Sequence, residues 1–529
     1  MFASRGFCSL LLYVMAKDDM PFDKKFNPEE LKQFLQNQYG AGVRVEVVPQ
    51  VQHDKTDETQ EGEESKSQPP QFDYKPREIK EYLDRYVIQQ DDAKKVLATA
   101  ICDHYHHIQS CAKQEDCRDY KKQNIVVIGP TGVGKTYLIQ NIAQLIGVPF
   151  VKADATKFSE TGYVGGDVED LVRELVSQAE GDISLAEWGI VYLDEIDKIA
   201  TSTSSMGRDV SGHGVQRGLL KMMEETEVPL RSSSDIASQM QAFMEFQSKG
   251  QVEKKTISTK HILFIVSGAF TGLTEIIKKR IGSKQIGFLE KATQVEEEHF
   301  LFEQVKSVDF IEYGFEAEFI GRLPVVVRCK PLSVDDLFRV LKYSKGSLLK
   351  QYKQDFLAYG VDVYFTDDGM LAIAGKAEKE QTGARGLMKV CEKTFREYKY
   401  QLPDHTVKEF IVSKDVVEDP LDNLKDLLKE PAMFRDKVFQ FQLEKIEQQF
   451  SEKYGIEFKF TALAGKLLSE KAEAAGEDLL AYCENLFAEY EHGLNLLRKI
   501  SGGTKFVVDE DVIQDPEATL ERLIKETYN

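Results

Sequence analysis

A glycine-rich octapeptide, GPTGVGKT at residues 129–136, constrains the fold of this chain more than any other feature. An apolar run at 125–128 precedes it, and a helical pattern at 137–146 follows it. This order of strand, loop and helix is typical of a phosphate-binding loop. Its glycines let backbone N–H groups converge on phosphate oxygens, and the helix N-terminus adds its dipole. The motif therefore predicts an α/β fold with a nucleotide site after this strand.

Every residue of the octapeptide is expected to contribute to nucleotide binding. Lys135 would supply a positive charge to the β- and γ-phosphates, and the Thr136 hydroxyl would ligate Mg²⁺. The alternative is a glycine-rich turn that matches by chance, and the strand and helix around it argue against that. The predicted binding residues are Gly129, Pro130, Thr131, Gly132, Val133, Gly134, Lys135 and Thr136.

A second motif, GIVYLDEIDK at residues 189–198, predicts a buried strand that ends in two carboxylates. Ligands bind at the carboxyl ends of strands in open α/β sheets. Asp194 is placed to hold Mg²⁺, and Glu195 to polarise a water molecule for attack on the γ-phosphate. Acidic residues often follow strands. Together with the phosphate-binding loop, however, these two favour ATP hydrolysis over nucleotide binding alone.

Strands and helices alternate along the large central part of the chain, which predicts a parallel sheet with helices on both faces. Further along, the composition turns helical and contains one short pair of strands, so a smaller α+β domain is expected there. The β-rich runs of the central part are 148–151, 190–193 and 262–266, and the later pair is 361–365 and 409–412.

The last part of the chain repeats the smaller domain. Four segments recur in the same order and at nearly constant spacing, which chance similarity between helices does not explain. The small domain is therefore expected to be duplicated. The matching segments are 359–366 with 454–461, 391–398 with 483–490, 410–420 with 506–516, and 427–430 with 523–526.

Four parts are expected in all. They are an N-terminal helix and flexible linker at 1–73, a large ATPase domain at 74–330, a small domain at 331–430, and its second, diverged copy at 431–529.

The first part has little that could fold on its own. An apolar run at 7–15 raises the possibility of a signal peptide, but its cleavage pattern is poor and acids follow at once. The preferred interpretation is that translation starts at Met15 and that residues 1–14 are an extension. Residues 26–39 could form one amphipathic helix, whereas 49–71 have almost no large apolar side chain and predict a flexible linker.

Composition excludes several classes of protein. The net charge of −20 argues against non-specific binding to nucleic acid or to an anionic membrane surface. No apolar run approaches the ~18 residues of a membrane-spanning helix. The seven cysteines form no CxxC pair, so neither a disulfide framework nor a four-cysteine zinc site is expected, and a cytoplasmic location is predicted. The expected cofactors are ATP and Mg²⁺, without zinc.

About two-thirds of the chain resembles the ClpX family of AAA+ protein unfoldases, with the HslU family as its nearer cousin. The resemblance implies an AAA+ P-loop NTPase large domain, a homo-hexameric ring, and protein substrates that are threaded through its central pore using ATP. The blocks that carry it are YVIQQDDAKKVLA, NIVVIGPTGVGKT, ADATKFSETGYVGGDVEDLV, GIVYLDEIDKIA, RDVSGHGVQRGLLKMME, HILFIVSGAF, AEFIGRLPVVV and TGARGLMKV.

The resemblance also implies roles for single residues of the nucleotide site. Val87 and Ile88 match the apolar patch that packs against adenine, although Gln89 stands where the family has glycine. Ser267 matches the residue that senses the γ-phosphate or orients water. Arg322 matches the arginine finger that reaches a neighbouring subunit, and Arg385 the small-domain arginine that contacts nucleotide in its own subunit.

Two further segments imply contacts with other proteins. Tyr163 and Val164, between two glycines, match the pore loop that grips substrate; the alternative is a surface turn with a half-buried tyrosine. Ile286, Gly287 and Phe288 match a tripeptide that docks on a ClpP-type peptidase; the alternative is a buried turn.

The chain departs from the family in three places. The N-terminal zinc domain is absent, and the segment 227–259 lacks the Arg-Lys-His loop that helps to choose substrates. The third departure is the second copy of the small domain, in which AAGEDLL at 474–480 replaces the GARG segment. Its Glu477 and Asp478 would repel phosphate, so this copy is not expected to sense nucleotide.

The leading interpretation is an ATP-dependent unfoldase that feeds a ClpP-type peptidase. The first alternative is a remodelling chaperone without a peptidase. The second is a nucleotide-gated scaffold with weak catalysis, which the complete set of expected catalytic residues disfavours.

Overall fold

The computed structural model describes eleven stretches of the chain, all within one of its two compact units, Lys66–Asn529. The N-terminal part therefore lies outside the described residues, including the helix expected at 26–39 and the linker expected at 49–71. The described stretches are 72–112, 121–158, 166–200, 212–231, 255–282, 300–455, 457–477, 479–487, 505–515, 518–519 and 522.

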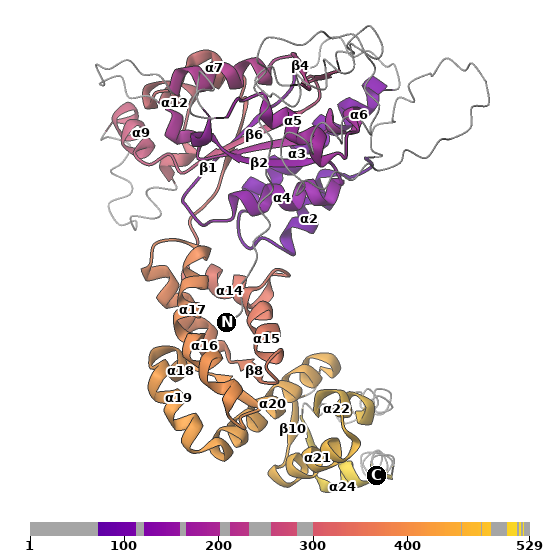
Figure 1. Cartoon of the computed structure of the whole chain (residues 1–529). Helices are drawn as coiled ribbons and strands as arrows, with labels where there is room; N and C mark the ends of the chain where they lie inside the picture. Colours follow the sequence, from indigo (N-terminus) through magenta and orange to yellow (C-terminus); the bar gives the residue numbers. More distant parts are fainter. Residues whose placement is uncertain are drawn as a thin grey trace, which may run out of the picture. The chain divides into compact units, whose positions relative to one another are not determined.

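A parallel sheet of five strands forms the centre of the large domain (Figure 1). β1 lies between β6 and β7, although the chain runs from β1 to β2 at one edge of the sheet. The loop after β1 is thus at a switch in strand order, where open α/β sheets bind ligands. In spatial order the strands are β2 (Phe150–Asp154), β3 (Ile190–Asp194), β6 (Leu263–Gly268), β1 (Ile125–Ile128) and β7 (Val325–Arg328).

Alternate residues of each strand enter different hydrophobic cores, because successive side chains of a strand point to opposite faces. Val126 and Ile128 pack into one core, and Ile125 and Val127 into the other. The prediction of an α/β sheet with helices on both faces is confirmed. The first core is closed by α5 (Asp170–Gln178), α7 (Gly212–Met223), α9 (Leu273–Ile281), α12 (Ser307–Tyr313) and α13 (Ala317–Gly321), and the second by α2 (Pro76–Asp84), α3 (Asp91–Ala112) and α4 (Lys135–Ile146).

The first small domain encloses a third core around a parallel pair of strands, β8 and β9. A parallel pair needs a long crossover, which two helices provide here. The elements in order are α14 (Val334–Tyr343), α15 (Leu348–Leu357), β8 (Asp362–Phe365), α16 (Asp367–Lys379), α17 (Ala384–Gln401), β9 (Glu409–Val412), α18 (Lys414–Glu418) and α19 (Pro420–Lys429).

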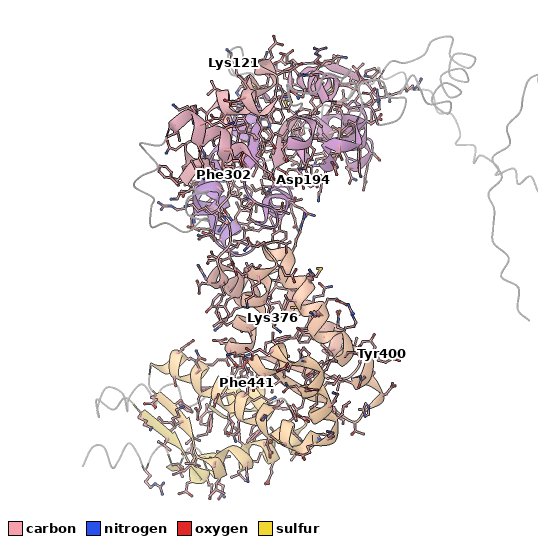
Figure 2. The ribbon with its side chains drawn as sticks, turned by 90° about the vertical axis from the view of Figure 1, so that its left-hand side faces the viewer. Lys121, Asp194, Phe302, Lys376, Tyr400 and Phe441 are labelled. Carbon is pink, nitrogen blue, oxygen red and sulfur yellow. The ribbon has the colours of Figure 1, made fainter. Side chains whose placement is uncertain are left out.

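The second module, within residues 431–529, has its own core and repeats the order of strand, two helices, strand and short helix that begins at β8. The two modules also share single contacts: Lys376 Nζ donates to Val417 O at 2.6 Å (Figure 2), and Lys471 Nζ to Ile513 O at 2.8 Å. The two lysine contacts therefore occupy equivalent places in the two modules. The elements are α20 (Pro431–Tyr454), β10 (Glu457–Phe460), α21 (Ala462–Ala475), α22 (Leu479–Phe487), β11 (Lys505–Val508) and α24 (Glu510–Gln514), with β10 and β11 parallel.

One long helix, α20, packs on both the first small domain, called the first module from here on, and the second module. Phe434 near its start is buried in the core of the first module, whereas Ile446 and Phe450 are buried in the core of the second. Between them, the ring of Phe441 lies 6.4 Å from that of Tyr364 on β8 (Figure 2). The boundary expected at 430/431 therefore coincides with the start of a helix whose first turns pack on the preceding domain.

Two further findings concern the cysteines and the hydrophobicity of the helices in the described part of the chain. Among the described residues, the free cysteines Cys102, Cys329, Cys391 and Cys483 are all buried. Within the described stretches, no helix has the length and apolar character needed to cross a bilayer.

Truncation should reveal how α20 is shared. A chain ending at Phe441 keeps Phe434 in the first core, whereas a chain ending at Glu430 loses it, and loss of a buried phenylalanine costs about 3 kcal/mol or more. We expect the shorter chain to melt at a clearly lower temperature, as followed by circular dichroism. Equal melting temperatures would contradict the assignment of Phe434 to the first core. Sedimentation with ATP would show whether either chain still assembles.

Candidate nucleotide site

A cavity of about 600 Å³ opens at the carboxyl end of the sheet, beside the glycine-rich loop. The start of α17 from the first small domain also lines it. Ser267 does not line it, nor do Gly129 and Pro130. The predicted binding or catalytic residues that line the cavity are Val87, Ile88, Thr131, Gly132, Val133, Gly134, Lys135, Thr136, Asp194, Glu195 and Arg385.

The loop can fold as it does because Gly132 has no side chain. Its φ of 77° lies in the left-handed region, and a Cβ there would collide with the carbonyl of Thr382. Across the same contact, Ala384 N donates to Gly132 O at 2.8 Å. The first turn of α17 is thereby bonded directly to the phosphate-binding loop, which brings Arg385 to the cavity.

Lys135 is held by the loop that precedes it. Its ammonium donates to Gly129 O at 2.6 Å and to Pro130 O at 2.8 Å. Burial lowers the pKa of Lys135, because the charged form is poorly solvated there. A phosphate oxygen would be a stronger acceptor than these carbonyls, so the side chain is well placed to bind one.

The side chains of Thr136 and Asp194 meet at the end of β3. Thr136 Oγ1 donates to Asp194 Oδ2 at 3.0 Å, and Ser267 Oγ donates to Asp194 Oδ1 at 2.6 Å. A hydroxyl and a carboxylate are the hard oxygen ligands that Mg²⁺ prefers, so these residues fit the ion that the sequence implies. Ser267 is fully buried and reaches the site through Asp194.

Tyr192 joins the same cluster and was not among the residues predicted from sequence. Its hydroxyl lies 2.7 Å from Ser267 Oγ and 3.1 Å from Thr136 Oγ1. A tyrosine within an aliphatic strand suggests only a buried ring. The available signal is its spacing of two residues from Asp194, which places both side chains on the same face of β3.

The backbone turns sharply after Asp194. Glu195 has a φ of 58°, in the left-handed region that residues other than glycine rarely adopt. The side chain of Glu195 is exposed and lines the cavity. Two residues on, Asp197 is buried, and its Oδ1 accepts from Ala269 N at 3.2 Å. Asp197 therefore ties the end of β3 to the loop after β6, a role that the sequence analysis did not predict.

The segment after α2 supplies an apolar wall of the cavity through Val87 and Ile88, both largely buried. Gln89, at the family's glycine position, has a φ of 60°, so it adopts the left-handed conformation that glycine would favour. The side chain of Gln90 then exchanges two hydrogen bonds of 2.7 Å with the backbone of Lys330. This exchange anchors the segment.

Arg322 does not line the cavity of its own chain. It follows α13, and its Nη2 donates to Glu224 Oε1 at 2.5 Å. Both side chains are about half exposed, at 51% and 45%. The guanidinium is therefore accessible from outside the chain.

The residues predicted to contact other proteins lie outside the described residues. They are Tyr163, Val164, Ile286, Gly287 and Phe288. The ends of the segment that carries the first two are described: Gly166 N donates to Lys157 O at 3.2 Å, and Phe158 and Gly166 form a β-bridge.

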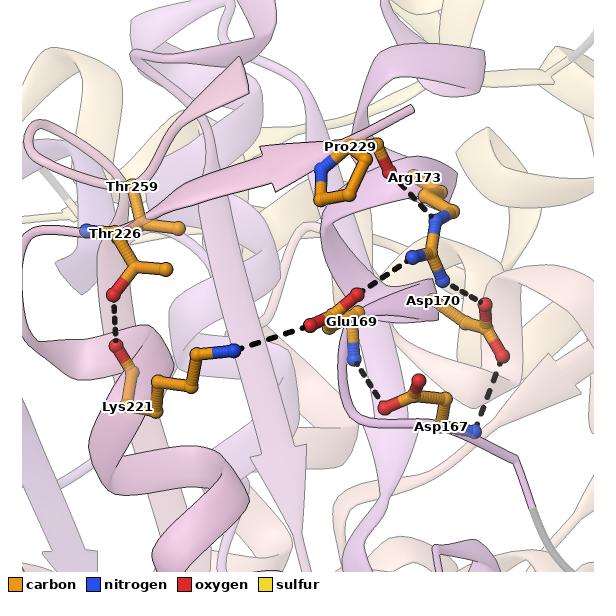
Figure 3. A network of polar contacts seen from close by, with 8 residues as sticks. All are labelled: Asp167, Glu169, Asp170, Arg173, Lys221, Thr226, Pro229 and Thr259. Carbon is orange, nitrogen blue, oxygen red and sulfur yellow. Dashed lines mark hydrogen bonds and ion pairs between the residues drawn. The ribbon is translucent and has the colours of Figure 1, made fainter. Parts of the chain in front are cut away.

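A polar network fixes the chain just after that segment (Figure 3). Arg173 donates to Asp170 at 2.6 Å, to Glu169 at 2.7 Å, and through Nε to Pro229 O at 3.0 Å. Lys221 on α7 reaches Glu169 at 3.5 Å. The N-terminus of α5 is thus tied to both α7 and β4 (Glu227–Pro229), so the base of the segment is well anchored.

Comparison with known proteins agrees with this arrangement. The family model described as AAA domain (Cdc48 subfamily) matches residues 120–326. The ATP-dependent Clp protease ATP-binding subunit ClpX of Treponema denticola is 40% identical over 347 residues, or 65% of this chain and 81% of that protein. Proteins of the same name from Borrelia duttonii and Borrelia recurrentis are 40% identical over 347 residues, or 65% of this chain and 78% of theirs.

The phosphate-binding loop, the parallel sheet and the AAA domain define an AAA+ ATPase. With relatives at this level of identity, the chain belongs to the ClpX family and is an ATP-dependent protein unfoldase of the AAA+ class.

Replacing the carboxylate of Glu195 should stop hydrolysis without removing the site. We expect Glu195→Gln to bind ATP normally and to hydrolyse it at least about 100-fold more slowly, because water activation is lost while phosphate contacts persist. Phosphate release and binding of a fluorescent nucleotide measure the two effects. Glu180→Gln is a matched control, since Glu180 is also exposed with a φ of 55°. Near-normal turnover of Glu195→Gln would refute the assignment.

Proposed function

We propose that this chain assembles into a homo-hexameric ring that threads proteins through its pore and delivers them to a ClpP-type peptidase. One observation carries the proposal: Lys135, Asp194 and Arg385 meet at one cavity, whereas Arg322 lies away from it with an exposed guanidinium. A site completed by a second copy of the chain requires a ring or a related assembly.

Each site residue has a distinct proposed task. When bound, ATP supplies the γ-phosphate to be cleaved, and Mg²⁺ offsets its negative charge. Lys135 contacts the phosphates, Thr136 and Asp194 hold the cation, and Glu195 accepts a proton from the attacking water. Arg385 lies on α17 of the small domain, and the first turn of this helix is hydrogen-bonded to the phosphate-binding loop. Arg385 can therefore respond to the nucleotide that the loop binds.

The names of the relatives support a ClpP-type peptidase as the partner of this chain. They are ATP-binding subunits of Clp protease, and Ile286, Gly287 and Phe288 are the proposed peptidase contact in this chain. A ring that does not bind a ClpP-type peptidase would instead be a stand-alone remodelling chaperone.

We assign residues 431–529 to a second copy of the small domain that does not sense nucleotide. It keeps the core and the lysine contact of the first copy. Glu477, in the segment that replaces GARG, is exposed. A copy with its core intact and its phosphate-reading arginine missing is suited to recruiting substrates or partners.

Action of Arg322 across subunits can be tested by mixing. We expect Arg322→Ala to bind ATP but to lose about 1,000-fold in hydrolysis, the size of effect reported for arginine fingers. Adding Lys135→Ala subunits, which lack a working site but carry an intact Arg322, should restore part of the rate. The matched control is Arg396→Ala, which removes an exposed, paired arginine far along the chain. If mixing restores nothing, Arg322 does not act in trans.

Tyr163→Ala should separate ATP use from work on substrate. The described residues on either side of Tyr163 are paired, with Gly166 N donating to Lys157 O, so we expect the surrounding fold to tolerate the change. We expect ATP hydrolysis to persist and unfolding of a stable tagged protein to fall sharply, with Tyr163→Phe restoring it. Equal loss of both activities would indicate a structural role.

The peptidase contact is tested by co-sedimentation of the ring with a ClpP-type peptidase. We expect Phe288→Ala to weaken binding by about 2 kcal/mol, as is typical of a buried aromatic anchor. ATP hydrolysis and unfolding should be unchanged while degradation is lost. Full degradation by Phe288→Ala, or no binding by the unaltered ring, would favour the stand-alone chaperone.

A further inference from the structure

Four side chains at the end of β3 form a closed ring of contacts. Thr136 and Ser267 each donate to one oxygen of Asp194, at 3.0 and 2.6 Å. Tyr192 lies between the two hydroxyls, 2.7 Å from Ser267 and 3.1 Å from Thr136. Tyr192 and Ser267 are both fully buried, so no solvent competes for these contacts.

Counting protons fixes the direction of each bond. An ionised carboxylate only accepts hydrogen bonds, so Thr136 and Ser267 each donate their single hydroxyl proton to Asp194. Tyr192 is left with one proton for two neighbours. Its 2.7 Å contact with Ser267 has the usual length of an O–H···O bond, whereas 3.1 Å to Thr136 is longer than usual. Tyr192 therefore donates to Ser267.

Tyr192 can donate to only one of its two neighbours, because its phenolic hydroxyl carries a single proton. Ser267 has then only one acceptor within this ring for its own proton, which is Asp194 Oδ1. Oδ1 also accepts from Glu195 N at 3.1 Å, and Oδ2 accepts from Thr136. Both oxygens of Asp194 are thus held in place.

We propose that Tyr192 is a positioning residue: by donating to Ser267 it directs the Ser267 proton to Asp194 and fixes the orientation of that carboxylate. This inference rests on the proposed role of Asp194 at the magnesium position. It also changes the task of Ser267, which acts through Asp194 and does not touch the phosphate.

A purely structural tyrosine would also be buried and hydrogen-bonded, and the chain contains one. Tyr105 on α3 is equally buried, and its hydroxyl donates to the backbone oxygen of Trp188 at 2.9 Å. It does not line the nucleotide cavity. Tyr105→Phe removes the same hydroxyl and one hydrogen bond elsewhere, so it is the matched control.

The test compares Tyr192→Phe, Ser267→Ala, the double variant and Tyr105→Phe in the full chain. For each, three quantities are measured: the Mg²⁺ concentration for half-maximal ATP hydrolysis, the affinity for a fluorescent ADP analogue in EDTA, and the melting temperature. Lys135→Ala serves as the reference for loss of the nucleotide site.

We expect Tyr192→Phe to raise the half-maximal Mg²⁺ concentration about fivefold, the equivalent of one net hydrogen bond. Its nucleotide affinity in EDTA should not change, because Lys135 and the loop are untouched. Ser267→Ala should shift the Mg²⁺ dependence in the same direction. The double variant should be no worse than Ser267→Ala, because Tyr192 acts through Ser267. Tyr105→Phe should alter at most the melting temperature.

The proposal fails if Tyr192→Phe leaves the Mg²⁺ dependence unchanged, or if its effect adds in full to that of Ser267→Ala. These failures leave the proposed function standing. By contrast, unimpaired hydrolysis by Lys135→Ala would overturn the nucleotide site itself, and the inference with it.

Discussion

The carboxylate of Asp194 is the interaction on which the site depends, because it joins segments that are far apart in sequence. It accepts hydrogen bonds from Thr136 at the start of α4 and from Ser267 near the end of β6. These partners meet because β6 pairs in parallel with both β3 and β1, so the carboxyl ends of the strands form one edge. A one-residue change in strand register would move a side chain to the opposite face of the sheet and break the cluster.

A second contact couples this cluster to the small domain. The bond from Ala384 N to Gly132 O places the first turn of α17 on the phosphate-binding loop. Side chains are absent at both Gly132 and Gly383, and a Cβ at either would collide with backbone across the contact. The position of the small domain and the conformation of the loop therefore depend on each other, which suits an enzyme that converts ATP hydrolysis into movement.

Farther along the chain, α20 makes the second module an extension of the first. Its early residues pack with β9 and α19, and its later residues with β10 and α22, within one uninterrupted helix. Lys459 on β10 also pairs with Glu447 of α20 at 2.6 Å, which ties this strand to the same helix.

The sequence by itself determined the class of fold, the phosphate-binding loop and the acidic strand end, because each is a short local pattern. The repeat at the end of the chain stays a prediction from the sequence. The spacing of GPTGVGKT and of the strand ending at Asp194 needs no tertiary information to be recognised. Only the tertiary structure placed Tyr192 and Asp197 beside these residues, showed that Ser267 hydrogen-bonds to Asp194, and placed β7 at the edge of the sheet. A polar atom on an apolar strand has no partner in the local sequence; its partner comes from another strand, and strand pairing alone brings the two together.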